Sequence, residues 1–158
     1  MRALVQRVRH AAVYSVEDGA GAGPVDAPVG RIGLGFVVLL GVRVDDTPQH
    51  ADALAGRVAG LRVFADDAGR LNRSILDVGG EVLSIPQFTL YADTRHGRRP
   101  SFLDAAPPER AEPLYERFNA RLAEAGIRVA PGAFRTHMLV EIHNDGPVTV
   151  LLEAPVPP

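Results

Sequence analysis

The run GLGFVVLLGV at residues 33–42 limits what this chain can fold into more than any other segment. It is apolar, rich in β-branched residues and bounded by glycines, which is typical of a strand that is fully buried. No run of the chain approaches the roughly 18 apolar residues that a membrane-spanning helix needs. We therefore expect a protein that builds its core around this strand and does not insert into a membrane.

Alternating polar and apolar residues predict further strands around the central one. We expect the first two to form a hairpin or a neighbouring pair, and the last two to form a closing hairpin around the turn Asn144-Asp145-Gly146-Pro147. Residues 17–29 are rich in Gly, Ala and Pro without periodicity, so they are expected to be an exposed excursion. The segments predicted to be strands, besides 33–42, are 2–8, 11–16, 61–64, 81–88, 137–143 and 148–153.

Two segments have the spacing of amphipathic helices. The first, 48–60, begins with an N-cap threonine and a first-turn proline, Thr47-Pro48. The second, 108–125, contains Pro113 in its second turn, where a proline removes a hydrogen bond, so an irregular start or a bend is expected there. The predicted buried positions are Ala51, Leu54, Val58 and Leu61 in the first helix and Ala111, Leu114, Tyr115, Phe118 and Leu122 in the second. We expect a single mixed α/β domain over residues 1–158, rich in strands and covered by two helices.

Residue types that are missing exclude several kinds of chemistry. The chain has no Cys, which excludes a thiol nucleophile, a disulfide, an iron–sulfur cluster and a thiolate zinc site. It also has no Lys, which excludes a lysine Schiff base and the phosphate-binding loop that needs Gly-Lys. The five histidines form no H-x-H or H-E-x-x-H pair. We therefore predict no catalytic metal and no cofactor.

The charge limits the kinds of partner. A net charge of −2 argues against a protein that coats long DNA, because that mode of binding needs a strongly basic face. Contact with the end of an RNA stays possible through two local clusters of positive residues, one at 2–10 and one at 95–99. The start MRALVQRVRH does not have the pattern of a signal peptide, so the cytoplasm is the expected compartment.

Three separated motifs carry the functional information: PQFTL at 86–90, RRPSF at 98–102 and NDGPVT at 144–149. Together with ALVQRV near the start, VVLLGV in the central strand and RAEPLYERF in the second helix, they make the chain resemble the D-aminoacyl-tRNA deacylase family over its whole length. One short string such as QFTL recurs by chance, but several in the correct order are specific.

The resemblance implies a β-barrel-like deacylase fold that works as a homodimer on the 3′ end of aminoacyl-tRNA. Its active site would lie where two protomers meet. One chain would supply the strand end with Gln87, Phe88 and Thr89, and the partner would insert its Gly146-Pro147 dipeptide with two backbone carbonyls aimed at the substrate. The resemblance implies that Arg7 holds this dipeptide in place. It also assigns substrate contacts to Pro86, Arg99, Pro100, Ser101 and Phe102, with Arg98 beside them.

The implied chemistry is ester hydrolysis without a reactive side chain. In the family picture the 2′-hydroxyl of the terminal adenosine helps to activate water, and backbone N–H groups near Phe88 and Thr89 stabilise the oxyanion. A covalent mechanism through the Thr89 hydroxyl is a second hypothesis, but it needs an adjacent base that the sequence does not identify. A third hypothesis is a module that binds an RNA end without catalysis.

One residue departs from the main branch of the family, which usually has Ser where this chain has Pro86. A related branch with Pro at this position holds its Gly-Pro bond trans and acts on mischarged L-alanyl-tRNA. Because Phe88 and the neighbouring motifs match the main branch, we expect removal of D-amino acids and glycine, with a cis bond at Gly146-Pro147. The L-alanyl activity is the alternative.

Overall fold

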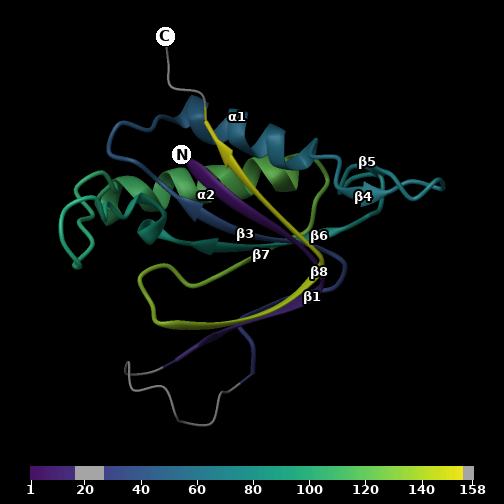
Figure 1. The fold of residues 1–158 in the computed structure, drawn as a ribbon, viewed down its shortest axis with the longest axis horizontal. Helices are drawn as coiled ribbons and strands as arrows, with labels where there is room; N and C mark the ends of the chain where they lie inside the picture. The colour runs from purple at the N-terminus through teal and green to yellow at the C-terminus, as the bar shows by residue number, and fades with distance from the viewer. Residues whose placement is uncertain (17–26, 155–158) are drawn as a thin grey trace.

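A computed structural model describes residues 1–16 and 27–154. A six-stranded sheet is covered on one face by two helices, α1 (Pro48–Ala59) and α2 (Pro108–Glu124), which lie side by side in Figure 1. The sheet has the order β2-β1-β3-β6-β7, and β8 pairs with β1. Its strands are β1 (Arg2–Ser15), β2 (Gly30–Ile32), β3 (Gly35–Gly41), β6 (Glu81–Pro86), β7 (Val129–Pro131) and β8 (Met138–Glu153). The expected strand-rich α/β fold with a barrel-like sheet and two flanking helices is confirmed.

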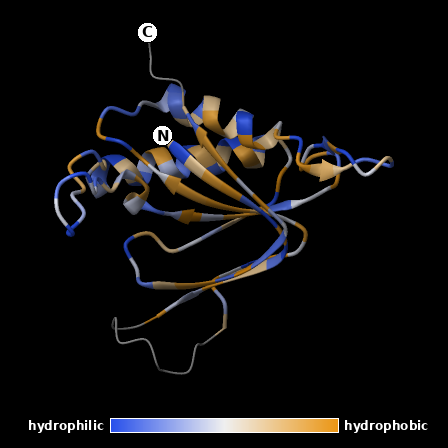
Figure 2. Ribbon diagram, viewed as in Figure 1, coloured by the Kyte–Doolittle hydropathy of each residue, from blue (hydrophilic) through white to orange (hydrophobic). Residues whose placement is uncertain are grey.

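The central apolar run forms β3, which is buried along nearly its whole length. It pairs antiparallel with β1 and parallel with β6, so it lies inside the sheet with a strand on each side. One core fills the space between the sheet and the helices, and a second lies on the opposite face, where β1, β2 and β8 curve under the sheet. Figure 2 shows the hydrophobic colour concentrated along these strands. Apolar side chains therefore cover both faces of β3.

The two helices confirm the faces predicted from periodicity. Every apolar position predicted for α2 is buried, and in α1 Ala51, Leu54 and Val58 are buried while Leu61, just beyond its end, is half-buried. The helix α2 continues through Pro113, which lies on the exposed side, so the Glu109 carbonyl that it leaves without an N–H partner can be hydrated. Neither helix of the described chain is long and apolar enough to cross a membrane.

Both predicted hairpins at the ends of the chain are wrong. Residues 2–15 form one continuous strand, and residues 138–153 form another, and these two long strands pair with each other antiparallel. Local breaks in the apolar alternation had indicated turns, but they mark register shifts at which both strands bend. The partner of each terminal strand is therefore a strand from the other end of the chain.

Smaller differences concern the short elements. The predicted strand 61–64 is reduced to β4 (Phe64–Ala65), which pairs with β5 (Leu71–Arg73) in a separate two-stranded sheet. Strand β6 ends at Pro86, and residues 88–91 form the 3₁₀ helix η1 (Phe88–Tyr91) instead of continuing the strand. Strands β2 and β7 were not predicted, since three residues carry no measurable periodicity. The excursion expected at 17–29 falls mostly outside the described residues.

Candidate active site

A pocket of about 760 Å³ opens at the end of β6. We call it the β6 pocket. Pro86, Gln87, Phe88 and Phe102, all predicted from the motifs, line it. Thr89 follows directly in η1 and is exposed. Gln87 is the last residue here that pairs with β3, donating its N–H to the Leu40 carbonyl (2.8 Å). The residues after it leave the strand and form η1 beside the pocket.

Two backbone N–H groups beside the β6 pocket are unpaired. Among the described residues, the N–H groups of Phe88 and Thr89 have no hydrogen-bond acceptor, because the first turn of a 3₁₀ helix has no carbonyl upstream to receive them. The Gln87 side-chain amide donates to the Thr89 hydroxyl, and this is the only side-chain hydrogen bond of that hydroxyl within the described chain. An amide is not a base, so this contact does not activate Thr89 as a nucleophile.

Most of the pocket wall was not predicted from the sequence. Tyr115 and Ala111 of α2 and Phe134 and Met138 beyond β7 line the β6 pocket together with the predicted residues. The Tyr115 hydroxyl donates to the Ser84 carbonyl (2.8 Å), and burial raises the pKa of this phenol. Periodicity had correctly placed Tyr115 on the buried face of its helix, but no sequence signal distinguishes a core aromatic residue from one that borders a cavity.

Gly146 and Pro147 lie in a bulge of β8. Gln6 of β1 faces Thr149, and Val8 faces Asn144, so residues 145–148 stand opposite Arg7 alone and protrude from the strand. The Asn144 amide closes the bulge, since its oxygen accepts from Val148 N–H (3.1 Å) and its nitrogen donates to the Thr149 hydroxyl (3.0 Å). The Gly146-Pro147 bond is cis, as expected from the match to the main branch of the family.

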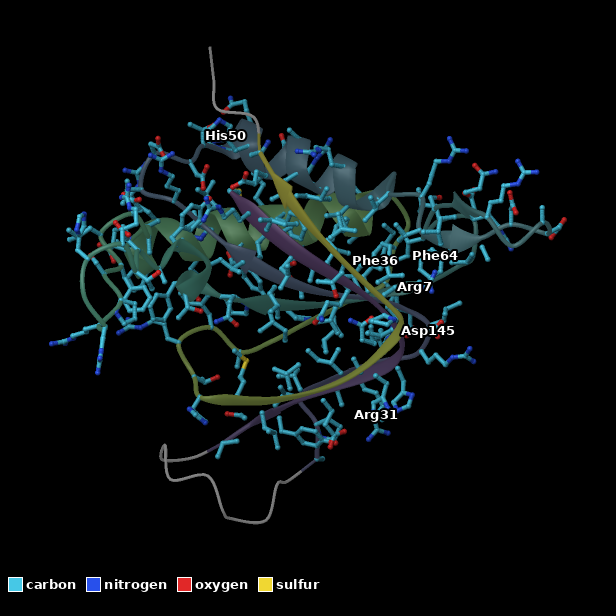
Figure 3. The ribbon with its side chains drawn as sticks, viewed as in Figure 1. Arg7, Arg31, Phe36, His50, Phe64 and Asp145 are labelled. Atoms are coloured by element: carbon cyan, nitrogen blue, oxygen red, sulfur yellow. The ribbon has the colours of Figure 1, made fainter. Side chains whose placement is uncertain are left out.

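Arg7 fixes the base of this bulge, which we call the Gly-Pro bulge. Its side chain points toward Asp145 in Figure 3 and donates from Nε to the Asp145 carbonyl (3.0 Å) and from Nη1 to the Val63 carbonyl (2.5 Å). The Arg7 side chain is largely buried, at 14% exposure. Arg9 adds a second contact to the Asp145 carboxylate (3.3 Å). Arg7 thus contacts the bulge through a carbonyl acceptor adjacent to Gly146.

Within one chain the Gly-Pro bulge and the β6 pocket are far apart. Arg7 is in register with Phe36 of β3, whereas Pro86 is in register with Leu40, four residues further along that strand. Four residues span about 13 Å along a strand, and the three steps from β8 to β6 span about 14 Å across the sheet, so the separation is on the order of 20 Å. The predicted site residues therefore form two groups at opposite ends of the sheet.

The remaining predicted residues lie near the β6 pocket without lining it. Arg99, Pro100 and Ser101 belong to the loop between η1 and α2, whose base is closed where Asp93 and Ser101 exchange backbone hydrogen bonds of 2.8 and 2.9 Å. Phe102 follows directly and packs edge-on against Phe88, with ring centroids 5.0 Å apart. Within the described part of the chain, no three acidic, His or Cys side chains come close enough together to hold a metal ion.

Comparison with known proteins agrees with the pattern of motifs. The family model described as D-Tyr-tRNA(Tyr) deacylase matches residues 4–153. A protein of Deinococcus deserti named D-aminoacyl-tRNA deacylase is 53% identical over 98% of this chain and 100% of its own length. The chain belongs to the D-Tyr-tRNA(Tyr) deacylase family.

Two solved structures have the same fold. A structure described as the c-Myc DNA unwinding element binding protein superposes with a TM-score of 0.85 at 36% identity, covering 99% of this chain and 100% of that one. A second, described as "a probable eukaryotic D-amino acid tRNA deacylase", superposes with a TM-score of 0.78 at 17% identity, covering 96% and 98%. The second likeness concerns the fold alone.

Proposed function

We propose that this protein hydrolyses the ester bond between a D-amino acid, or glycine, and the 3′-terminal adenosine of tRNA. The observation that carries the proposal is the match to deacylases along almost the whole chain, including all three motifs that form the β6 pocket and the Gly-Pro bulge. In this proposal the chain contributes backbone groups and no reactive side chain. The free N–H groups of Phe88 and Thr89 would stabilise the oxyanion, and the site would exclude L side chains by backbone atoms.

The site requires a second copy of the chain. A Gly-Pro bulge on the order of 20 Å from its own β6 pocket cannot sort substrates there, whereas the bulge of a partner can enter it. The face of the sheet away from the helices carries a row of leucines in register, Leu151 of β8, Leu4 of β1 and Leu39 of β3. Leu151 is 51% exposed, and in one chain no element of the described residues covers it. We assign this row to the dimer interface.

The proposed activity is tested by comparing charged tRNAs. D-tyrosyl-tRNA and glycyl-tRNA should be hydrolysed by purified protein, while L-tyrosyl-tRNA should remain intact under the same conditions. L-alanyl-tRNA is included because Pro86, which marks the alternative branch, lines the β6 pocket. Clearance of L-alanyl-tRNA with D-tyrosyl-tRNA left intact would reverse the assignment, and no release of amino acid from any of them would indicate a module that only binds.

Replacing Thr89 by Ala is expected to leave turnover within about ten-fold of wild type. The hydroxyl contacts only the Gln87 amide among the described residues, so its loss removes a packing and hydrogen-bond contact and no nucleophile. Single-turnover hydrolysis of D-tyrosyl-tRNA measures the effect. Complete loss of activity, together with an acyl-enzyme seen by mass spectrometry in the wild type, would establish the covalent mechanism instead.

Replacing Leu151 by Glu is expected to give a folded, inactive monomer. The side chain is half exposed in one chain, so a carboxylate there costs little in the free protomer but is buried unpaired in the assigned interface. Sedimentation should give twice the 16.9 kDa chain mass for wild type and the single mass for the variant. Leu71→Glu makes the same change at a leucine that is 56% exposed in β5, in the separate two-stranded sheet, and this control should remain dimeric. A dimeric, active L151E variant would contradict the interface.

A further inference from the structure

The segment between β7 and β8 brings a permanent charge to the wall of the β6 pocket. Figure 1 shows this segment, residues 132–137, joining the part of the sheet under the helices to the long strand β8. Of the described residues that line the pocket, Arg135 is the only arginine, and none is an aspartate or glutamate. Because a guanidinium stays charged at any ordinary pH, the pocket favours a ligand that brings a negative charge.

The backbone of Arg135 has a conformation that favours glycine. Its φ is +59°, in the left-handed region, and every other described residue with a positive φ is a glycine. The segment is fixed at its start, where Gly132 donates its N–H to the Ser84 carbonyl (2.7 Å). It is fixed at its end, where the His137 carbonyl accepts from the Val16 N–H (2.9 Å). A glycine would adopt this φ without strain, and strain of this kind is concentrated at ligand sites.

The Arg135 side chain is available to a ligand. It is exposed, and among the described residues it has neither a carboxylate within ion-pair distance nor a side-chain hydrogen bond. By contrast, the exposed Arg117 and Arg128 each have a carboxylate oxygen at 2.7 Å. Phe134, which precedes Arg135, packs against Tyr115 with ring centroids 6.0 Å apart and holds the segment at the pocket wall. An unpaired guanidinium presents a planar fork of N–H donors that matches two oxygens of a phosphate.

We propose that Arg135 binds the phosphate on the 5′ carbon of the nucleoside whose 3′ oxygen carries the amino acid. The proposal rests on the proposed function, which places this nucleoside in the β6 pocket. The phosphate is the negative group nearest to the ester, whereas the amino acid carries an ammonium group that a guanidinium repels. The phosphate therefore lies toward Arg135 and the ammonium away from it. A contact to the sugar-phosphate backbone is independent of base sequence and does not choose between D and L amino acids.

Two small substrates that differ by this one phosphate test the contact. They are 3′-O-D-tyrosyl-adenosine and its 5′-monophosphate. The wild-type kcat/KM should be about ten-fold or more higher on the phosphorylated substrate, as expected for hydrogen bonds between charged groups. In Arg135→Gly this ratio should fall to within about two-fold of one, mainly through KM, because the phosphate takes no part in the reaction. Arg135→Lys keeps the charge without the fork and should retain part of the ratio. Equal losses on both substrates, or an unchanged ratio in Arg135→Gly, would overturn the proposal.

Two controls separate the phosphate contact from other effects of the substitution. Arg70→Gly makes the same change at an exposed arginine in the turn between β4 and β5, and it should leave the ratio unchanged. The second control is 3′-O-D-aspartyl-adenosine, which has a side-chain carboxylate and no phosphate. A larger loss on this substrate than on 3′-O-D-tyrosyl-adenosine would assign Arg135 to acidic amino acids and would overturn the phosphate contact.

Urea unfolding distinguishes a residue that serves a ligand from one that serves the fold. Arg135→Gly removes backbone strain, so its midpoint should equal or exceed that of wild type. Arg70→Gly places a glycine where φ is not positive, so its midpoint should fall slightly. A midpoint for Arg135→Gly well below that of Arg70→Gly would show that the arginine stabilises the segment itself, contrary to the proposal.

Calorimetry with adenosine 5′-monophosphate and with adenosine tests the contact without hydrolysis. Wild-type protein should bind the nucleotide about ten-fold more tightly than the nucleoside, and Arg135→Gly should bind the two about equally. If these results hold while no charged tRNA is hydrolysed, the proposed function fails and the phosphate contact stands. Equal binding by wild type, or no binding of either compound, would overturn the phosphate contact.

Discussion

Replacing Gly146 by Ala is expected to abolish deacylation, lowering kcat by about 100-fold or more, while the protein stays folded. A Cβ at this position would lie 2.8 Å from Val148 Cγ2, 3.0 Å from Val148 N and 3.1 Å from Arg7 Nη2, and the φ of +133° is one that L residues rarely adopt. The Gly-Pro bulge must therefore shift. A displacement of about 1 Å at a site of this kind costs on the order of 10²-fold in rate.

Stability should change far less than activity in this variant. Gly146 and Pro147 are exposed in one chain, so moving them removes no core contact, and the strain at one residue costs about 1–3 kcal/mol. Single-turnover hydrolysis of D-tyrosyl-tRNA and urea unfolding measure the two effects. Gly69→Ala is the control, because Gly69 has a φ of +75° and an added Cβ there would meet nothing within 4 Å, so it reproduces the backbone strain away from the site. Wild-type kinetics in Gly146→Ala would contradict the role of the bulge.

Mixing two inactive variants tests whether the bulge acts on its partner. Phe88→Pro removes one of the two free N–H groups and should by itself reduce kcat by about 10²–10³-fold. Gln87 has φ −142° and ψ 79°, which lies outside the α region that a following proline disfavours. In a mixed dimer with Gly146→Ala, one of the two sites combines an intact pocket with an intact bulge. Random exchange of protomers should restore about a quarter of the wild-type sites. No recovery after verified exchange would place both groups in one protomer.

Replacing Gly35 by Ala is expected to lower the free energy of unfolding by about 3 kcal/mol or more, or to prevent folding. Gly35 of β3 is in register with Glu81 of β6, and a Cβ there would lie 1.8 Å from the Glu81 carbonyl oxygen and 2.6 Å from its nitrogen. These are backbone atoms, which cannot rotate away as a side chain can. The two parallel strands would have to separate at the point where the central pairing begins.

Urea unfolding and soluble yield measure this effect against a matched glycine. Gly56 lies inside α1 with nothing within 4 Å of an added Cβ, so Gly56→Ala should raise the free energy of unfolding by about 0.5–1 kcal/mol. Both substitutions add one methyl group, in a strand with no room for it at Gly35 and at an open helix position at Gly56. A soluble Gly35→Ala variant with the stability of wild type would show that β3 and β6 can relax around the new methyl group.

The sequence predicted the parts of this protein whose structure is decided by neighbours along the chain. Helices α1 and α2 and their buried faces follow from apolar residues at three- and four-residue spacing, and β3 follows from its continuous apolar run. The motifs PQFTL and RRPSF also identified four residues that line the β6 pocket. For the helices and β3 the predictive pattern lies within one element, whereas the pocket residues were identified through the family resemblance.

The tertiary structure decided which strands pair and where the predicted site residues lie. Nothing local to residues 2–15 or 138–153 reveals that these strands pair with each other, since each could as well have folded back on itself. That pairing creates the bulge opposite Arg7 and places Gly146 and Pro147 far from Gln87 and Phe88. The register between distant strands depends on which side chains fill the two cores on the faces of the sheet. Those cores are built by the whole chain, so no single segment of the sequence determines the register.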